Sequence, residues 1–168
     1  MSSRQPTGVA HVDFFTTTHR ISGAIQTGPR RLSDVLNDRS QSYLLVSSVY
    51  VSRLDKPGEI GAHAPVAYLS KENLCFVIVP SQEARFIESG RFRVQKSEAL
   101  VTLPGFEVRG TFVGPRRADV RSFSPAALDA FLVLTEATAQ NIAAPKVVYQ
   151  GKAILVNQAY LESLCLME

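Results

Sequence analysis

The sequence predicts a mainly β protein that consists of two small five-stranded barrels in tandem, with short helical turns. Two observations support this fold class: apolar and polar residues alternate over several short segments, and one of these segments is echoed later in the chain. ISGAIQTGPRR at 21–31 returns as VRGTFVGPRR at 108–117. Each copy alternates as a half-buried strand does and then ends in a Gly-Pro turn. We therefore expect a first barrel at 9–81, a linker at 82–95 and a second barrel at 96–168.

The first half has the pattern of five strands and one helical turn. HVDFFTTTHRISGAIQT is rich in β-branched and aromatic residues, and YLLVSSVYVSRL is the strongest strand pattern in the chain. Leu32, Val35 and Leu36 have helical spacing, which predicts one helical turn between the second and third strands. The strands are expected at 10–17, 19–27, 43–54, 66–69 and 73–79. A strand, a bent strand, a long strand and a short closing pair form the order of a strongly bent small barrel.

The second half repeats this order, with corresponding residues 87 or 88 positions apart. The anchors of this alignment are Gly23 with Gly110, Tyr43 with Phe131, and Lys71 with Gln158. One segment gives conflicting signals, because PAALDAFLVLTEATAQNIAA is rich in Ala and Leu and has better helix than strand propensity. The correspondence with the longest strand of the first half nevertheless predicts a strand at 131–140. A Ser-Pro pair at 124–125 predicts the start of a helical turn before it.

Aromatic residues on the expected strands are assigned to two environments. The alternation predicts that Phe14, Tyr43 and Tyr68 lie in the barrel core, while Phe15 and Tyr50 face outward. Exposed aromatic rings of this kind are suitable platforms for stacking of nucleic-acid bases. No basic residues alternate with these rings, however, as they do in strands dedicated to RNA binding.

Composition predicts a soluble, cytoplasmic protein that does not contact a membrane. The chain has 168 residues, of which 45% are hydrophobic, and this is enough to bury a core. No apolar run reaches the roughly 18 residues of a membrane span, and the N-terminus lacks the apolar segment of a signal peptide. Cys75 and Cys165 both lie within apolar runs, so we expect them to be buried and reduced.

Two segments carry a resemblance to a known family. VDFFTTTHRISGAIQ at 12–26 resembles the first hairpin of bacterial Sm-like proteins of the Hfq type, and VAYLSKENLCFVIVP at 66–80 is similar to their last two strands. The second half resembles them more weakly, through VTLPGFEVRGTF and AILVNQAYLESLCL. The chain as a whole also resembles a group of uncharacterised bacterial proteins.

The resemblance implies Sm-like, or SH3-like, barrels that assemble in rings or pairs through exposed strand edges, and single-stranded RNA in a pore. In the Hfq type, a Lys-His pair in the last turn lines that pore. Here the turn contains Lys71 followed by Glu72, so the basic residue is present and the His is absent. The corresponding turn of the second half contains no basic residue.

The repeated Gly-Pro-Arg-Arg loops are the main candidates for a chemical role. Arg side chains and main-chain N–H groups of such a loop can bind a phosphate or a carboxylate, and 85–121 carries eight basic against four acidic residues. The alternative is an ordinary polar turn, in which Arg31 pairs locally with Asp34. The candidate anion- or nucleic-acid-binding residues are Arg30, Arg31, Arg116, Arg117 and Lys71.

Motifs for catalysis or for metal binding are absent from the sequence. His11, His19 and His63 do not have the spacing of zinc ligands, and no nucleophile motif or phosphate-binding loop occurs. We therefore expect neither an enzyme nor a cofactor. Two functions remain: a homo-oligomeric assembly or adaptor module, and a weak, sequence-independent binder of RNA or single-stranded DNA that uses the Arg-rich loops. The apolar content of the halves favours assembly.

Overall fold

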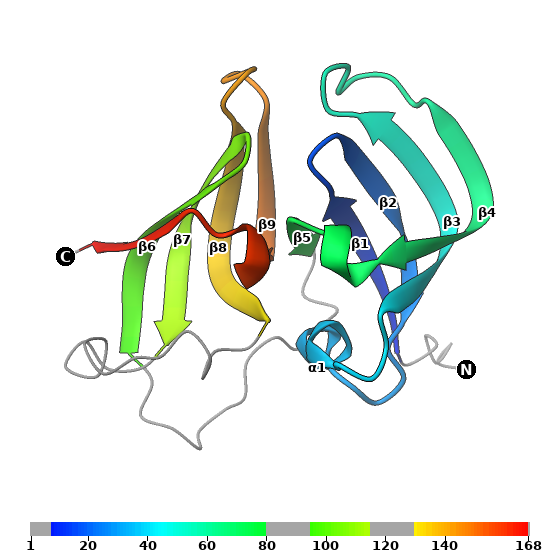
Figure 1. Cartoon of the computed structure of the whole chain (residues 1–168), viewed down its shortest axis with the longest axis horizontal. Coiled ribbons are helices and arrows are strands. Elements are labelled where there is room, and N and C mark those ends of the chain that lie inside the picture. The colour runs from blue at the N-terminus through cyan, green and yellow to red at the C-terminus, as the bar shows by residue number, and fades with distance from the viewer. Residues whose placement is uncertain (1–7, 80–94, 115–129, 168) are drawn as a thin grey trace, which may run out of the picture.

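The computed structural model describes residues 8–79, 95–114 and 130–167, and these form an almost entirely β structure (Figure 1). The expected linker at 82–95 and the helical turn expected at 124–125 lie outside the described residues, except for Gln95, the first residue of β6. Besides the strands, the described residues include a short helix α1 at Leu32–Asn37 and the 3-10 turns η1 at Lys71–Asn73 and η4 at Gln158–Tyr160. The strands are β1 (Val9–Phe15), β2 (His19–Gln26), β3 (Tyr43–Arg53), β4 (Ala62–Ser70), β5 (Phe76–Val79), β6 (Gln95–Leu103), β7 (Phe106–Gly114), β8 (Phe131–Asn141), β9 (Val148–Asn157) and β10 (Ser163–Met167).

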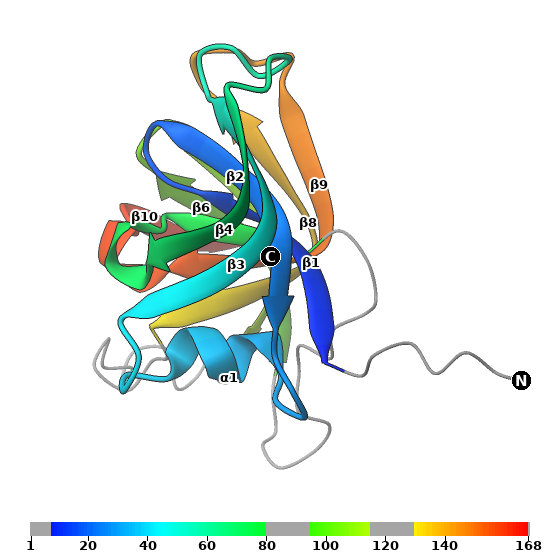
Figure 2. The ribbon, with the colours of Figure 1, turned by 90° about the vertical axis from the view of Figure 1, so that its right-hand side faces the viewer.

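All ten strands belong to one antiparallel sheet in the order β10-β6-β7-β8-β9-β5-β1-β2-β3-β4. The prediction of a mainly β fold is confirmed, but the described strands form one open sheet and not two closed barrels. The reason lies in β5, which pairs with β1 along one edge and with β9 along the other. Figure 1 shows β5 between the two halves, and Figure 2 shows the strong curvature of β3 and β4.

Two hydrophobic cores lie on opposite faces of the middle of this sheet. Successive residues of β5 alternate between them: Val77 and Val79 belong to the first core, and Phe76 and Ile78 to the second. All four side chains are buried. The continuous apolar run of β5 is thus explained, because a strand that is covered on both faces has no polar side.

Glycines mark the points at which the strands bend. The pairing of β2 with β3 shifts register at Gly23, and the pairing of β7 with β8 shifts at Gly110. A Cβ atom on Gly23 would lie 2.5 Å from Cγ1 of Val46, so β2 and β3 approach too closely there for any side chain. Opposite these bends, Ser48 of β3 and Glu136 of β8 have φ angles of 51° and 46°.

The strand boundaries agree with the sequence predictions in most places. The segment expected to be a strand at 131–140 is β8, so the correspondence between the halves predicted its structure better than helix propensity did. β4 begins at Ala62, four residues before the expected start, because it pairs with β3 as far as Val51. Its Pro65 is tolerated since β4 is an edge strand within the described sheet.

The prediction that Tyr43 and Tyr68 lie in the core is wrong. Leu44 and Leu69, which are their neighbours in the sequence, point inward, so the alternation of the strands turns both tyrosines outward. Tyr50 is exposed, as expected, and stacks on the ring of His63. The outer surface of β3 and β4 is therefore much richer in large apolar side chains than the sequence interpretation allowed.

Phe14 is buried in the first core, as predicted, but the prediction that Phe15 faces outward is wrong. The ring of Phe15 enters the second core, where it stacks on Phe76 with a centroid distance of 4.4 Å. It also meets Tyr149 of β9 edge-on, at 4.9 Å. β1 thus places Phe14 in the first core and Phe15 in the second. In an isolated barrel, one of the two faces of β1 would be exposed to solvent.

Candidate assembly interface

In the first Gly-Pro-Arg-Arg loop, main-chain N–H groups donate hydrogen bonds to main-chain carbonyl oxygens of the protein itself. The amides of Thr27 and Gly28 both donate to the carbonyl oxygen of Gly8, at 2.6 and 3.3 Å. The amide of Arg30 donates to the carbonyl oxygen of Thr27 at 3.2 Å. These donors hold the loop against the start of β1, and so they are not available as an anion-binding nest.

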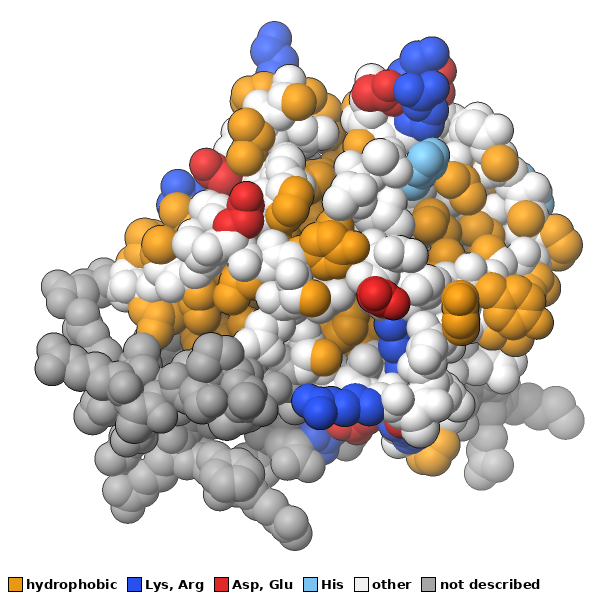
Figure 3. Space-filling model, viewed as in Figure 1, with side chains coloured by type: hydrophobic (Ala, Val, Ile, Leu, Met, Phe, Trp, Pro, Cys, Tyr) orange, Lys and Arg blue, Asp and Glu red, His pale blue; other side chains and the backbone are white. Residues whose placement is uncertain are grey.

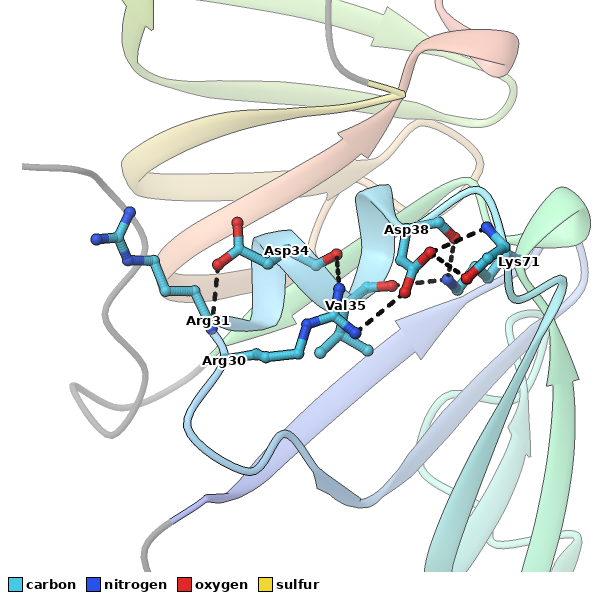
Figure 4. Close-up of polar contacts among 7 residues, drawn as sticks. Arg30, Arg31, Asp34, Val35, Asp38 and Lys71 are labelled. Carbon is cyan, nitrogen blue, oxygen red and sulfur yellow. Dashed lines mark hydrogen bonds and ion pairs between the residues drawn. The ribbon is translucent and has the colours of Figure 1, made fainter. Parts of the chain in front are cut away.

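Arg30 and Arg31 lie where this loop meets α1 (Figure 4). The guanidinium of Arg30 donates to the carboxylate of Asp38 at 3.1 Å and to the carbonyl oxygen of Asp34 at 3.0 Å. The amide of Arg31 donates to the carboxylate of Asp34 at 3.3 Å, which satisfies one donor at the start of the helix. The hydroxyl and amide of Ser40, together with Arg30, lower the pKa of Asp38 to about 2.

Lys71 is buried beneath the other end of α1 (Figure 4). Its Nζ donates to the carbonyl oxygens of Val35 and Asp38, at 2.6 and 2.9 Å. Burial lowers the pKa of its ammonium, since removal from water disfavours the charged form. Lys71 therefore satisfies the carbonyl groups at the C-terminus of the helix, and this position does not present it to a ligand on the surface.

The structure therefore brings together only part of the predicted anion site. Arg30 and Lys71 meet at α1, where Asp38 lies between them, and Arg31 lies at the start of the same helix. Arg116 and Arg117 lie outside the described residues. Anion binding by Arg116 and Arg117 therefore stays a prediction from the sequence.

A different surface stands out at one end of the sheet. β4 pairs with β3 on one side, and no other strand among the described residues covers its second edge. Large apolar side chains lie beside that edge: we define the β3–β4 patch as Tyr43 (62% exposed), Leu45 (55%), Val66 (48%) and Tyr68 (74%). Leu45 and Tyr68 are direct cross-strand neighbours. Figure 3 shows hydrophobic side chains gathered over these two strands.

The opposite end of the described sheet, at β10, also has an unpaired strand edge with apolar side chains. β10 pairs with β6 alone within the described sheet. Leu164 and Leu166 of β10 are partly buried against the second core, whereas Met167 is 41% exposed. Cys165 is exposed as well, so the prediction that it is buried is wrong: its neighbours Leu164 and Leu166 face the core, and the alternation of the strand turns Cys165 outward. Among the described residues, the sheet thus ends in two unpaired edges with apolar side chains at each, an arrangement that favours the addition of a further strand.

The sequence contains a signal for the β3–β4 patch that the interpretation missed. YLLV at 43–46 is apolar at four successive positions, so both faces of β3 are apolar where a half-buried strand would have polar residues on one. Such a run indicates a strand that is covered on both faces. In the described structure only one face is covered.

A hollow of about 580 Å³ lies between the two halves, but its chemistry is not distinctive. Its lining includes His19, Asn141, Arg53 and Asp55. Arg53 is engaged by Asp55 through two bonds of 2.9 and 2.6 Å. In the part of the chain that the structure describes, no group of three or more His, Cys, Asp or Glu side chains is placed to hold a metal ion.

Comparison of the chain with models of known protein families, with curated proteins and with solved structures gave no match. The resemblance to the Sm-like proteins therefore stays an expectation from the sequence. No helix in the described segments is long and apolar enough to cross a membrane.

Proposed function

We propose that this protein is a non-enzymatic assembly or adaptor module that forms homo-oligomers through the two edges of its sheet. The observation that carries the proposal is the β3–β4 patch, in which four apolar side chains lie 48 to 74% exposed beside an unpaired strand edge. An exposed edge with apolar neighbours is unfavourable in a monomer, because apolar surface stays in contact with water and the unpaired N–H and C=O groups can pair with a strand of another molecule. Self-association buries the apolar surface and pairs the edge.

Natural proteins protect free edges with charged side chains, prolines or short strands. β4 has one such device, Pro65, but the stretch from Val66 to Leu69 that follows it carries no charge. β10 likewise carries no charged residue between Ser163 and Met167. These segments are therefore suited to pairing with another strand.

The alternative function, RNA or single-stranded DNA binding through the Arg-rich loops, receives less support. Arg30 is paired with Asp38, and the ammonium of Lys71 is buried. The first loop also has its amides bonded internally.

Multi-angle light scattering after size-exclusion chromatography tests this function. We expect a mass that is a multiple of the 18.4 kDa chain at micromolar concentration. Leu45→Glu, in the patch, should lower the oligomer mass while retaining the β circular dichroism spectrum. Ile142→Glu is the matched control, because Ile142 is as exposed as Leu45, at 53 and 55%, but lies in the turn between β8 and β9. A monomeric wild-type protein would overturn the proposal.

A further inference from the structure

The strands of the two halves correspond in length, in register and in the position of their backbone irregularities. β3 and β8 are both eleven residues long, and in each the sixth residue, Ser48 or Glu136, has a positive φ. The register of each strand with its next neighbour also agrees: Leu45 pairs with Tyr68 in the first half, and Val133 pairs with Leu155 in the second.

This correspondence of strand positions assigns a counterpart in the second half to every residue of the β3–β4 patch. Ser48 and Glu136 fix the alignment of β3 with β8, and the strand pairings extend this alignment to β4 and β9. The patch residues are thereby matched with residues on the corresponding face of β8 and β9. The counterparts of Tyr43, Leu45, Val66 and Tyr68 are Phe131, Val133, Ala153 and Leu155.

The counterparts have the opposite exposure. Phe131, Ala153 and Leu155 are 3, 0 and 0% exposed, and Val133 packs against the same cluster. That cluster is the first core, so the second half buries this face against the first half. The contact includes α1, where the amide of Phe131 donates to the side-chain oxygen of Asn37 at 2.8 Å. The surface that is exposed in one half is thus an interface in the other.

Inside the chain, the strand that pairs with the edge of β9 beside this face is β5, and β10 is the counterpart of β5. β5 follows η1 and pairs with β1, while β10 follows η4 and pairs with β6. The interval from each 3-10 turn to the strand is the same, so Phe76 corresponds to Ser163 and Val77 to Leu164. β10 is therefore a second strand of the β5 kind, and its outer edge is uncovered within the described sheet.

We infer that β4 of one copy pairs with β10 of a second copy, and that this contact repeats the junction between β9 and β5. The inference rests on the proposed assembly function and adds its partner and its register. Inside the chain, Phe76 pairs with Val156, Val77 with Leu155, Ile78 with Ile154 and Val79 with Ala153. The same register between copies places Ser163 opposite Leu69, Leu164 opposite Tyr68, Cys165 opposite Ala67, and Leu166 opposite Val66.

The chemistry of both strands agrees with this register. Leu164 and Leu166 would lie against Tyr68 and Val66 of the β3–β4 patch, so apolar area is buried on both sides. Pro65 lies one residue beyond the four paired positions, and its missing N–H therefore removes no bond from the contact. Each copy would use β4 toward one neighbour and β10 toward the other, which is a head-to-tail arrangement.

The register can be tested by a disulfide bond that involves the native Cys165. Directly opposite residues of an antiparallel pair have Cα atoms about 4.5–5.5 Å apart, a separation that a disulfide can span. We expect Ala67→Cys to form disulfide-linked dimers or larger species under mild oxidation. Ala64→Cys is the control, because it lies three residues further along β4, about 10 Å away. It should crosslink at least about tenfold more slowly, since the reacting pair is held apart.

The Ala67→Cys crosslink should disappear when Cys165→Ser is added. A crosslink that persists without Cys165, or equal rates for positions 64 and 67, would overturn the register. Should Ala67→Cys fail to fold, Tyr68→Cys combined with Leu164→Cys, in a Cys165→Ser background, tests the adjacent pair. Light scattering on the wild type separates the two proposals: an oligomer without the 67–165 bond overturns the register alone, whereas a monomer overturns both.

Discussion

The ammonium of Lys71 donates to the main-chain carbonyl oxygen of Val35 across 2.6 Å, and so it joins the turn after β4 to the end of α1. A basic residue that resembles an RNA-contacting lysine in the sequence thus completes a helix C-terminus in the structure. The carbonyl of Asp38, at 2.9 Å, is its second acceptor. Lys71 consequently belongs to the framework of the first half, where its contribution to stability can be measured.

Replacement of Lys71 by Met should destabilise the protein by about 2–3 kcal/mol, because two carbonyl groups lose a charged donor. Urea unfolding, monitored by circular dichroism, measures this change. Lys56→Met provides the control, because Lys56 is exposed in the turn after β3 and its replacement should change the unfolding free energy by less than about 0.5 kcal/mol. Equal effects at the two positions would contradict the role assigned to Lys71.

The free energy of unfolding should decrease in acid, over the pH range in which Asp38 takes up a proton. Its pKa is about 2 in the folded protein and 3.8 at its ordinary value, so between these pH values the unfolded state binds more protons. The contribution of the carboxylate is therefore fully present above about pH 4 and is lost as the pH falls toward 2. Urea unfolding at pH 5, 4, 3 and 2.5 measures the effect.

The variant Asp38→Asn should show a shallower decline in stability over this window than the wild type. Ser40→Ala should lie between them, because it removes the hydroxyl that bonds to the Asp38 carboxylate at 2.6 Å. Parallel curves for the wild type and Asp38→Asn would show that the carboxylate is not the group responsible.

Substitution at the bend of β2 should be costly. Gly23→Ala places a methyl group 2.5 Å from Cγ1 of Val46 and 2.9 Å from the carbonyl oxygen of Ser47, and the strands must separate to accept it. We expect a loss of about 1–3 kcal/mol in the unfolding free energy. At Gly58 a Cβ would meet nothing within 4 Å, so Gly58→Ala should be neutral or slightly stabilising. A similar result for both would argue against the close approach.

The two cysteines should differ sharply in reactivity. Burial raises the pKa of the Cys75 thiol to about 11, whereas Cys165 is exposed on β10. Because the thiolate is the reactive form, a thiol reagent at pH 8 should label one cysteine in native protein and two in denaturant. Peptide mapping should place the native label on Cys165. Assembly through β10 should slow that labelling as the protein concentration rises.

The sequence pattern predicted the strands well because alternation is a local property. β2 was expected at 19–27 and lies at His19–Gln26, and β8 was recovered from its correspondence with β3 despite its helix propensity. The bends at Gly23 and Gly110 were likewise visible as small residues in alternating strands. These features depend on residues that are close in the sequence, or on the constant spacing between corresponding residues of the two halves.

The pairing of the halves could not be predicted in the same way. The contact of β5 with β9 joins 76–79 to 153–156, and no local pattern encodes the choice of that partner. The misassignment of Phe15 has the same origin, because its side chain is covered by the second half. The apolar run of β5 indicated burial on both faces but not what buries it. The exposure of Tyr68 could not be predicted either, because alternation places Tyr68 and Leu69 on opposite faces of β4 but does not say which face is covered.

The position of β5 has a consequence for the covalent continuity of the chain. Its Phe76 and Ile78 belong to the second core, although the strand is continuous with the first half. A protease that cut between residues 80 and 94 would leave every strand pair of the sheet in place. The nicked protein should therefore migrate as one particle until it is denatured. The two fragments should then recover the pairing of β5 with β9 only when they are mixed.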